Sequence, residues 1–310
     1  MVAILMSTYN GEKYLKEQID SILSQTYRDF VLFVRDDGSN DSTVKIIKSY
    51  DDSRIIFECG ENKGPAGSFF ALLNKAKDYE YVFFSDQDDV WYPEKLEKML
   101  TEIKKYGQVP TMVFSDFAMI DSNGYITAPS YSDYASLQVE EGNVEINKII
   151  AQPYVFGCAS VINRALSELV LNPPSQIEMH DCWISLVAAA TGNLIYMPYK
   201  AISHRFHNNN ATGKSGQDSF SARFFRITKG FFAQAENTQK RLYQVFLLLN
   251  EFENKITPKS LETLNSLSSA MKKGKFSTIK ALRKNGISRQ RKINTLFFYM
   301  TVFAIKGEIL

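Results

Sequence analysis

The sequence of 310 residues predicts an α/β fold: a mostly parallel, mixed sheet flanked by helices, followed by a helical C-terminal region. Three features predict it. Short apolar runs alternate with segments of helical period in the first part of the chain, and polar clusters follow several of these runs directly. From about Phe220 onward the pattern is helical, with breaks at Pro258 and Gly286. Connections that alternate strand and helix make neighbouring strands parallel.

Four strands are expected in the first part of the chain, and the continuous apolar run of β-forming residues at 81–84 indicates a strand buried on both faces. They are expected at residues 2–6, 30–34, 54–58 and 81–84. Helices with apolar residues at helical spacing are expected at 14–25, 44–47, 68–73 and 93–105. Pro93 stands at the start of the last of these helices, where its missing N–H costs nothing.

The second part of the chain predicts shorter elements. Strands are expected at 112–114, 155–162, 195–197 and 202–206, and a helix from about 179 to 190. Residues 120–125 look like a hairpin reversal. Residues 127–143 lack periodicity and are interpreted as a mobile loop or lid, with a plain surface loop as the alternative.

Three polar clusters directly follow predicted strands. They are Ser7–Gly11, Asp36–Ser42 and Asp86–Asp89. In parallel α/β sheets, ligands bind outside the carboxyl ends of the strands. The three clusters therefore predict one shared binding site at that edge.

The third cluster carries most of the charge. Alternation along an extended chain places Asp86 and Asp88 on the same side. Two close carboxylates repel each other unless a cation lies between them, and Mg²⁺ or Mn²⁺ is the natural occupant because such ions prefer oxygen ligands. The alternative is an acidic turn that caps the next helix.

Composition is ordinary for a globular protein, with 45% hydrophobic and 23% charged residues. The three cysteines, Cys59, Cys158 and Cys182, are scattered, which indicates reduced thiols in a cytosolic protein and neither a disulfide framework nor a zinc site.

Met1 leads straight into a short strand, so no signal peptide is expected. The longest apolar stretch, 293–305, is too short to span a bilayer.

Five motifs resemble those of family 2 glycosyltransferases with the GT-A fold, in matching order and spacing over roughly residues 2–210. They are Ser7-Thr8-Tyr9-Asn10-Gly11, Asp36-Asp37-Gly38-Ser39-x-Asp41-x-Thr43, Asn62-x-Gly64, Ser85-Asp86-x-Asp88-Asp89-x-Trp91 and His180-Asp181-Cys182-Trp183. The form Ser-Asp-Gln-Asp-Asp-Val-Trp of the fourth motif, with a later His-x-Asn-Asn, looks most like bacterial rhamnosyltransferases that build streptococcal and related cell-wall or capsular polysaccharides.

The resemblance implies an inverting, metal-dependent transfer of L-rhamnose from dTDP-rhamnose to a saccharide linked to a polyprenyl diphosphate carrier. It also implies a Rossmann-like GT-A catalytic domain over 1–215, with a nucleotide-sugar half over about 1–116 and an acceptor half over about 117–215. The helical region then covers 216–310. Mn²⁺ or Mg²⁺ is the implied cofactor.

The resemblance assigns the nucleotide-sugar site to nine residues: Thr8, Tyr9, Asn10, Asp37, Asn62, Lys63, Asp86, Gln87 and Arg205. Tyr9 would stack on the base, and Asp37 would accept a hydrogen bond from its ring N–H. A helix-capping turn is a second interpretation of Asp36 and Asp37, compatible with the first. For Asn62 and Lys63 the alternative is a simple loop.

The metal site and the catalytic base are implied in the same way. Asp88 would bind the ion that bridges the diphosphate, Asp86 would contact ribose or metal, and His207 would be a third ligand or a phosphate contact. Arg205 would help neutralise the diphosphate. Asp181 occupies the position of the family's base, which takes the proton of the attacking acceptor hydroxyl. The alternative is an N-cap on a helix that begins at Cys182.

Acceptor binding is assigned to Trp91, Trp183 and His180, with core packing as the alternative for both tryptophans. The family usually has an acid where this chain has His180, so the environment of Asp181 departs from the pattern. Cys158 is expected to be an inert core residue.

The C-terminal region is strongly basic. From Lys255 onward there are twelve Lys or Arg residues and two Glu, and the rest of the chain has a net charge of −8 because the whole chain carries +2. Basic residues between 272 and 292 alternate with apolar ones, which predicts amphipathic helices that could meet anionic lipid at the inner face of the cell membrane. The alternatives are a solvated helical bundle over the catalytic domain and a homodimer interface. Nucleic acid is not expected, because no base-reading motif accompanies the charge.

Two rival functions remain open from the sequence. One keeps the enzyme and changes the donor to a UDP-hexose. The other is a non-catalytic scaffold of the same fold at the membrane surface. The intact set of Asp86, Asp88 and Asp181 argues against a scaffold, which has no need for mutually repelling carboxylates.

Overall fold

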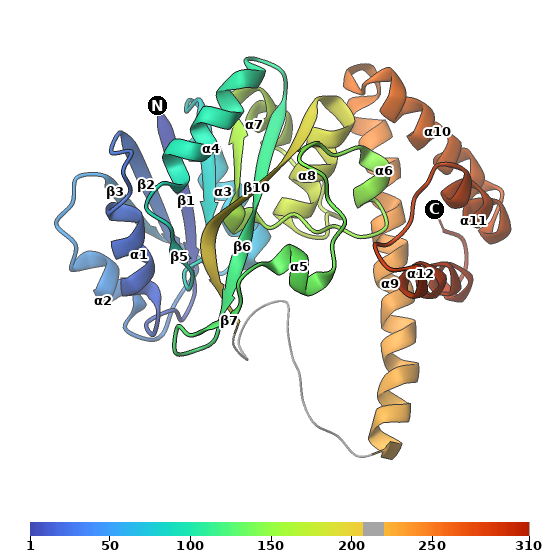
Figure 1. Cartoon of the computed structure of the whole chain (residues 1–310), viewed down its shortest axis with the longest axis horizontal. Coiled ribbons are helices and arrows are strands. Elements are labelled where there is room, and N and C mark those ends of the chain that lie inside the picture. Colours follow the sequence, from blue (N-terminus) through green and yellow to red (C-terminus); the bar gives the residue numbers. More distant parts are fainter. Residues whose placement is uncertain (207–219, 310) are drawn as a thin grey trace.

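The computed structural model describes residues 1–206 and 220–309, and its centre is one mixed sheet (Figure 1). In this part of the chain ten strands pair in the order β3-β2-β1-β4-β9-β6-β10-β5, with β7 on β6 and β8 on β10. The strands are β1 Val2–Thr8, β2 Phe30–Asp36, β3 Ile55–Cys59, β4 Tyr81–Ser85, β5 Val90–Trp91, β6 Thr111–Ile120, β7 Ile126–Ala128, β8 Gly142–Asn143, β9 Ser160–Asn163 and β10 Asn193–Arg205. The first four are mutually parallel, and β9 runs antiparallel to β4 and β6.

Helices cover both faces of the sheet. Before the C-terminal region they are α1 Leu15–Leu23, α2 Thr43–Lys48, α3 Gly64–Lys75, α4 Lys95–Ile103, α5 Tyr131–Ala135, α6 Ile146–Ile149, α7 Arg164–Val170 and α8 His180–Thr191, with 3-10 turns η1 Lys104–Tyr106 and η2 Gly157–Ala159. Each strand divides its side chains between two cores, as the two-residue period requires. In β4, for example, Val82 and Phe84 join the core under α3 and α8, while Phe83 joins the core under α1 and α4.

The C-terminal region is a layer of helices that shares the α3–α8 core. Its helices are α9 Phe220–Phe252, α10 Pro258–Lys272, α11 Lys275–Lys284 and α12 Lys292–Ala304, and η3 Glu253–Lys255 separates α9 from α10. Trp183 of α8 packs against Phe252 of α9, with ring centroids 6.1 Å apart. Thr257 N donates to the Ala190 carbonyl at 2.9 Å, so α10 begins directly on the end of α8. None of the described helices combines the length and the apolar character needed to cross a bilayer.

The expected mixed α/β sheet with flanking helices and a helical C-terminal region is confirmed. Three local predictions were wrong. Residues 127–143 hold α5 and β8 instead of an irregular loop, 155–162 contain η2 before β9, and the two strands expected at 195–197 and 202–206 are one strand, β10. Register shifts in β10 around Lys200 explain the last difference, since they interrupt the pattern without ending the strand. The predicted boundary at 215/216 lies outside the described residues.

A close approach between α8 and the sheet requires glycine at position 192. An added Cβ there would lie 2.0 Å from the carbonyl oxygen of Pro110, which is backbone and cannot move aside. Gly192→Ala is expected to lower the free energy of unfolding by about 1–3 kcal/mol, the usual range for overpacking. Gly230→Ala is the matched control: Gly230 is exposed within α9, has open space around it, and should gain about 0.5–1 kcal/mol. Urea denaturation measures both, and equal or reversed effects would contradict the packing described.

Candidate active site

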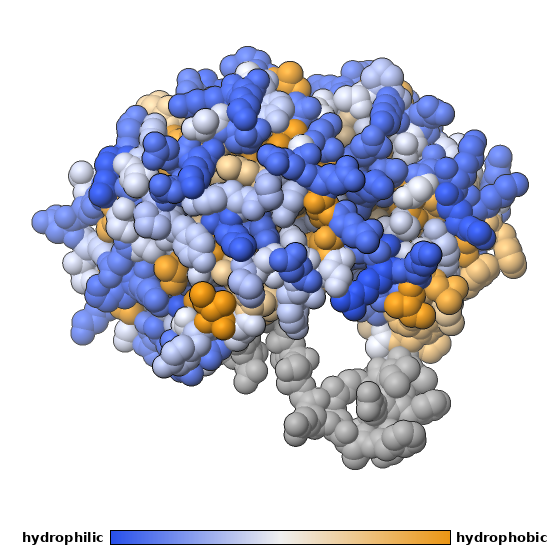
Figure 2. Space-filling model, viewed as in Figure 1, coloured by the Kyte–Doolittle hydropathy of each residue, from blue (hydrophilic) through white to orange (hydrophobic). Residues whose placement is uncertain are grey.

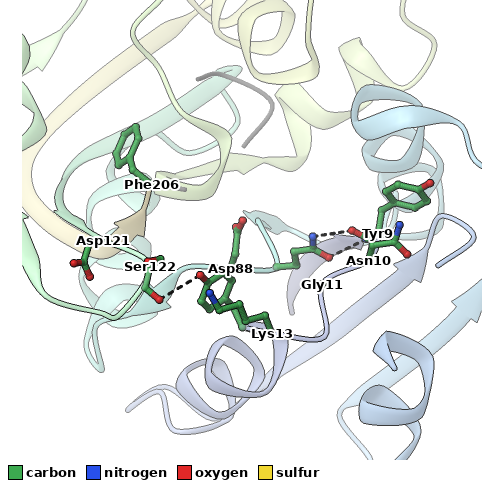
Figure 3. A pocket seen from close by; sticks show the side chains of 10 residues that line it. Tyr9, Asn10, Gly11, Lys13, Asp88, Asp121, Ser122 and Phe206 are labelled. Atoms are coloured by element: carbon green, nitrogen blue, oxygen red, sulfur yellow. Dashed lines mark hydrogen bonds between the residues drawn. The ribbon is translucent and has the colours of Figure 1, made fainter. Parts of the chain in front are cut away.

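The three polar clusters meet at the carboxyl ends of β1, β2 and β4, as the sequence predicts. A cavity of about 410 Å³ lies there, here called the first cavity. Eight of the predicted site residues line it: Tyr9, Asp37, Asn62, Asp86, Gln87, Asp88, His180 and Asp181. A second cavity of about 770 Å³ adjoins it across Gln87 and Asp88. Its lining includes Asn10, Lys13, Tyr14, Asp121, Ser122 and Phe206 (Figure 3).

The β1 cluster is held by hydrogen bonds to its neighbours. Tyr9 N donates to Gln87 Oε1 at 2.9 Å, and Gln87 Nε2 donates back to the Tyr9 carbonyl at 3.0 Å (Figure 3). Gly11 is required here, because a Cβ would lie 2.2 Å from Gln87 Oε1. Asn10 N donates to Ser39 Oγ at 2.8 Å. The exposed ring of Tyr9 is thereby fixed between the two cavities.

Thr8 does not reach either cavity. It is fully buried, and its hydroxyl donates to Asp36 Oδ1 at 3.0 Å. The expectation that Thr8 contacts a nucleotide is therefore corrected: its position in the interior of β1 makes it a support for the β2 turn.

Asp37 lines the first cavity and also organises the loop beside it. Its carboxylate forms a buried ion pair with Arg35 and accepts from Lys63 N at 2.9 Å and Gly64 N at 2.9 Å. Asn62 Oδ1 accepts from the same Gly64 N at 3.1 Å. Lys63 thus contributes its backbone N–H, whereas its side chain is not part of the cavity wall.

The carboxylates after β4 form a buried concentration of negative charge. Burial raises the pKa of Asp86 to about 7, and repulsion from Asp89 and Asp88 acts in the same direction. Asp89 is fully buried, and its Oδ1 lies 2.7 Å from Nδ1 of His204. Burial opposes the charged imidazole, but the Asp89 carboxylate outweighs it and raises the pKa of His204 to about 9. His204 therefore balances the charge of Asp89.

These groups also offer ligand atoms for a metal. Asp86, Asp89, Cys158 and His204 place one such atom each within 4.8 Å of one another. Asp89 Oδ2 is buried and has no hydrogen-bond partner among the described residues. Burial raises the pKa of the Cys158 thiol well above its usual value, which disfavours the thiolate that metal binding requires. The oxygen donors that fit a hard cation are therefore the carboxylates, of which Asp86 and Asp88 face the first cavity.

A buried lysine, Lys95, lies close to the carboxylates that follow β4. Lys95 Nζ donates to the Cys158 carbonyl at 2.6 Å and lies 3.3 Å from the centroid of the Trp91 ring. Burial lowers the pKa of Lys95 to about 7. Lys95 connects α4 to η2, and η2 in turn contacts Asp181, because Gly157 N donates to Asp181 Oδ2 at 3.2 Å.

Asp181 and His180 open α8 on the opposite wall of the first cavity. Met179 is the N-cap and the helix begins at His180, so Asp181 is in the first turn and is not the N-cap of a helix that begins at Cys182. A carboxylate in the first turn is stabilised by the helix dipole. His180 is 4% exposed and stacks on Phe69 with ring centroids 4.1 Å apart, and neither of its ring nitrogens has a hydrogen-bond partner among the described residues. Burial lowers the pKa of His180, so the ring is neutral.

Three other expectations are corrected by burial. Trp91 and Trp183 lie in the core and line neither cavity, so neither ring is an acceptor platform. The Arg205 guanidinium is also buried: it pairs with Glu17 at 2.6 Å and donates to the Asp88 carbonyl at 2.9 Å. Arg205 therefore fixes the loop that carries Asp88 and does not face the first cavity. His207 lies outside the described residues.

Sequence reasoning missed His204 and Lys95. The position of His204 within a predicted strand, two residues after Ile202, was a usable signal, since a buried imidazole needs a partner. Lys95 carried no such signal, because lysine at a helix start is ordinary. The three cysteines are free thiols, and Cys158 is buried in the core as expected.

Comparison with known proteins identifies a family. Residues 3–169, more than half of the chain, match the family model described as glycosyl transferase family 2. An uncharacterized glycosyltransferase of Rickettsia bellii is 26% identical over 219 residues, which cover 69% of this chain and 31% of that protein. Alignments to four further rickettsial glycosyltransferases cover 35–39% of those proteins. The chain thus spans well under half the length of these curated relatives.

Two relatives have more specific names. The dTDP-rhamnosyl transferase RfbG of Shigella flexneri is 29% identical over 241 residues, covering 72% of this chain and 78% of that protein. The UDP-Glc:alpha-D-GlcNAc-diphosphoundecaprenol beta-1,3-glucosyltransferase WfgD of Escherichia coli is 30% identical over 195 residues, covering 60% of this chain and 70% of that protein.

Solved structures share the fold. S. aureus TarS 1-349 in complex with UDP superposes with a TM-score of 0.56 at 18% identity, over 98% of this chain and 87% of that one. The mannosyltransferase PcManGT of Pyrobaculum calidifontis, in complex with GDP-Man and Mn²⁺, gives a TM-score of 0.55 at 16% identity, over 98% and 86% of the two chains. At these identities the likeness shows the fold alone.

The buried Arg35–Asp37 ion pair is expected to contribute to the free energy of unfolding. Asp37→Asn leaves the guanidinium of Arg35 buried without its carboxylate, and is expected to lower the free energy of unfolding by about 3–5 kcal/mol. Urea denaturation measures the loss. Asp51→Asn, at an exposed position, is the control and should change stability by less than about 0.5 kcal/mol. A stable Asp37→Asn variant would show that the ion pair does not hold the loop at 62–64.

Proposed function

The chain belongs to glycosyl transferase family 2, and on that premise we propose that it transfers a sugar, with inversion at the anomeric carbon, from a nucleoside diphosphate sugar to a saccharide linked to a polyprenyl diphosphate carrier. One observation carries the proposal. A single cavity brings together an exposed aromatic ring at Tyr9, the carboxylates of Asp86 and Asp88, and the carboxylate of Asp181 on its opposite wall. These are the groups needed to hold a base, to bind a divalent cation that would balance a diphosphate, and to take a proton.

We assign the nucleotide to the end of the first cavity formed by Tyr9, Asp37 and Asn62. The ring of Tyr9 offers a stacking surface for the base, and its backbone is fixed by the paired hydrogen bonds to Gln87. Asp37 is already held by Arg35 and two backbone N–H groups, so its oxygens are preset to accept from a base N–H. Asn62 and Lys63 belong to the loop that Asp37 fixes.

Asp86 and Asp88 would hold Mn²⁺ or Mg²⁺ at the diphosphate end. The donor set fits such an ion, because both are oxygen donors on the cavity wall, and burial together with repulsion from Asp89 and Asp88 raises the pKa of Asp86. When bound, the ion supplies positive charge that stabilises the leaving nucleoside diphosphate. The chain's own contribution is to keep the loop rigid, through Arg205 on the Asp88 carbonyl and His204 on Asp89.

Asp181 is proposed as the catalytic base. The acceptor O–H proton passes to its carboxylate while the acceptor oxygen forms a bond to the anomeric carbon. The bond from that carbon to the diphosphate oxygen breaks, and the nucleoside diphosphate leaves with the electron pair. Gly157 N–H fixes one oxygen of Asp181, and Cys182 N–H donates to the other at 2.8 Å, so the carboxylate is oriented before the acceptor arrives.

His180 is proposed to contact a sugar hydroxyl. Its two ring nitrogens are buried at the cavity wall and lack hydrogen-bond partners among the described residues, which is a costly state unless a ligand supplies them. A neutral imidazole offers one donor and one acceptor, and a hydroxyl group matches both.

L-rhamnose from dTDP-rhamnose is the donor we propose, in the synthesis of a cell-wall or capsular polysaccharide. The proposal is supported by the motif resemblance and by the relative RfbG, whose name gives that transfer. A UDP-hexose is the alternative, supported by WfgD, named as a transferase from UDP-Glc to a diphosphoundecaprenol-linked sugar. That name also supports a lipid-linked acceptor. A non-catalytic scaffold is disfavoured because Asp86, Asp88 and Asp181 all line the same cavity.

A nucleotide panel tests the donor and the metal together. Melting temperatures are measured with dTDP, UDP and GDP, each with Mn²⁺ and with EDTA. At about 100 times its dissociation constant, dTDP with Mn²⁺ should stabilise the protein by about 2.7 kcal/mol, or about 5 °C, because it binds only the folded chain. EDTA, or the Asp88→Asn variant, should remove most of the shift. A larger shift with UDP would establish the alternative donor class, and no shift with any nucleotide would contradict the enzyme assignment.

Asp181→Asn tests the base. The substitution keeps the shape of the side chain and removes its ability to take a proton, so turnover should fall at least about 100-fold while the nucleotide thermal shift is unchanged. Product is followed by mass spectrometry with lipid-linked acceptors. Asp51→Asn is the control and should retain full turnover. Undiminished transfer by Asp181→Asn would remove Asp181 from the mechanism.

A further inference from the structure

The last helix, α12, has one buried face and one exposed face. Phe298, Thr301 and Val302 point into the shared core and are buried. The other face is apolar as well but exposed, and consists of Ile293, Leu296, Phe297, Met300 and Phe303. Ile293 is 68% exposed and Leu296 is 56% exposed. Spacing of three or four residues places these five side chains in one stripe along the helix.

Two neighbouring helices extend the stripe into a surface. Phe276 of α11 is 81% exposed, and its ring lies edge-on to Phe303 at 4.9 Å between centroids. Phe232 of α9 is also exposed, with Lys306 Nζ 6.0 Å from its ring. We call the α12 stripe with Phe276 and Phe232 the apolar face. Figure 2 shows apolar residues gathered at the lower right of the molecule, over α11 and α12. An exposed apolar surface of this kind marks an interaction site.

The segment of the chain that contains α11 and α12 is strongly basic. Between Glu262 and Glu308 the chain has ten Lys or Arg residues and no Asp or Glu. Lys272, Lys273 and Lys280 are exposed on α10 and α11, and Lys292 and Lys306 lie at the two ends of α12. A partner that accepts both the apolar stripe and this charge must be apolar beneath an anionic surface.

We propose that the apolar face docks on an anionic phospholipid bilayer, with α12 lying in the plane of the interface. The aromatic and aliphatic side chains would enter the acyl boundary, while the lysines remain at the level of the headgroups, where each contributes about 1 kcal/mol. A second copy of the chain fits less well, because a two-fold interface brings the same surface together and would oppose the lysines of one copy to those of the other.

The placement of α12 agrees with this surface. Figure 1 shows α12 toward the same lower side as α5 and β7, the side at which the carboxyl ends of the parallel strands lie. This inference concerns a surface and does not depend on the transfer reaction.

Vesicle sedimentation of the full chain tests the proposal. The protein should sediment with vesicles of phosphatidylcholine mixed with phosphatidylglycerol, remain in solution with phosphatidylcholine alone, and be released by high salt. The double variant Leu296→Ser with Phe297→Ser should lose at least about tenfold in affinity, because the two side chains together forfeit more than about 1.4 kcal/mol of apolar burial on docking. Matched controls are Ile56→Ser and Val109→Ser, 48% and 47% exposed on other surfaces, which should bind as the native chain does.

A charge variant measures the electrostatic contribution to vesicle binding. Lys272→Glu with Lys273→Glu should weaken binding to the anionic vesicles, whereas Lys45→Glu with Lys48→Glu, exposed on α2, should not. Urea denaturation reports that each variant is folded. Equal binding by the Leu296/Phe297 variant and the native chain would overturn the proposal. So would a dimer in lipid-free buffer that this variant abolishes, because the apolar face would then belong to a second copy.

Discussion

The concentration of negative charge at the end of β4 is the constraint on which the site depends. A sheet covered on both faces leaves little water to screen Asp86, Asp88 and Asp89, so each carboxylate needs a partner or a proton. His204 balances the charge of Asp89 in the interior. Asp86 and Asp88, by contrast, lie on the wall of the first cavity, where a ligand can reach their carboxylates.

The sequence predicted the fold and the position of this site well, for physical reasons. Continuous apolar runs such as Tyr81–Phe84 can only be strands covered on both sides, and alternation with helices makes such strands parallel. The carboxyl ends of parallel strands then meet at one edge. That rule brought Tyr9, Asp37 and Asp86 into the same cavity although 28 residues or more separate them along the chain.

Contacts between distant side chains could not be predicted in the same way. Arg205 looked like a diphosphate ligand, yet its guanidinium is occupied by Glu17, a residue 188 positions earlier. Trp91 and Trp183 follow acidic motifs, but residue type does not reveal which face of the chain meets the core, and both are buried. Thr8 was assigned to the nucleotide by the resemblance of its motif, whereas it is fully buried as the last residue of β1. In each case a motif shows which residues are neighbours along the chain and not which are neighbours in space.

Helix α8 connects the proposed catalytic and docking parts of the molecule. Its first turn holds Asp181 at the first cavity, and its last turn is bound by the start of α10: Ser260 Oγ donates to the Ala189 carbonyl at 3.1 Å and Thr257 N to that of Ala190 at 2.9 Å. Trp183, midway, packs on Phe252 of α9. A close-packed helix of twelve residues transmits position without bending. The C-terminal helices are therefore fixed relative to Asp181. Under the two proposals, a bilayer that orients α12 would also set the distance between a lipid-linked acceptor and the proposed base.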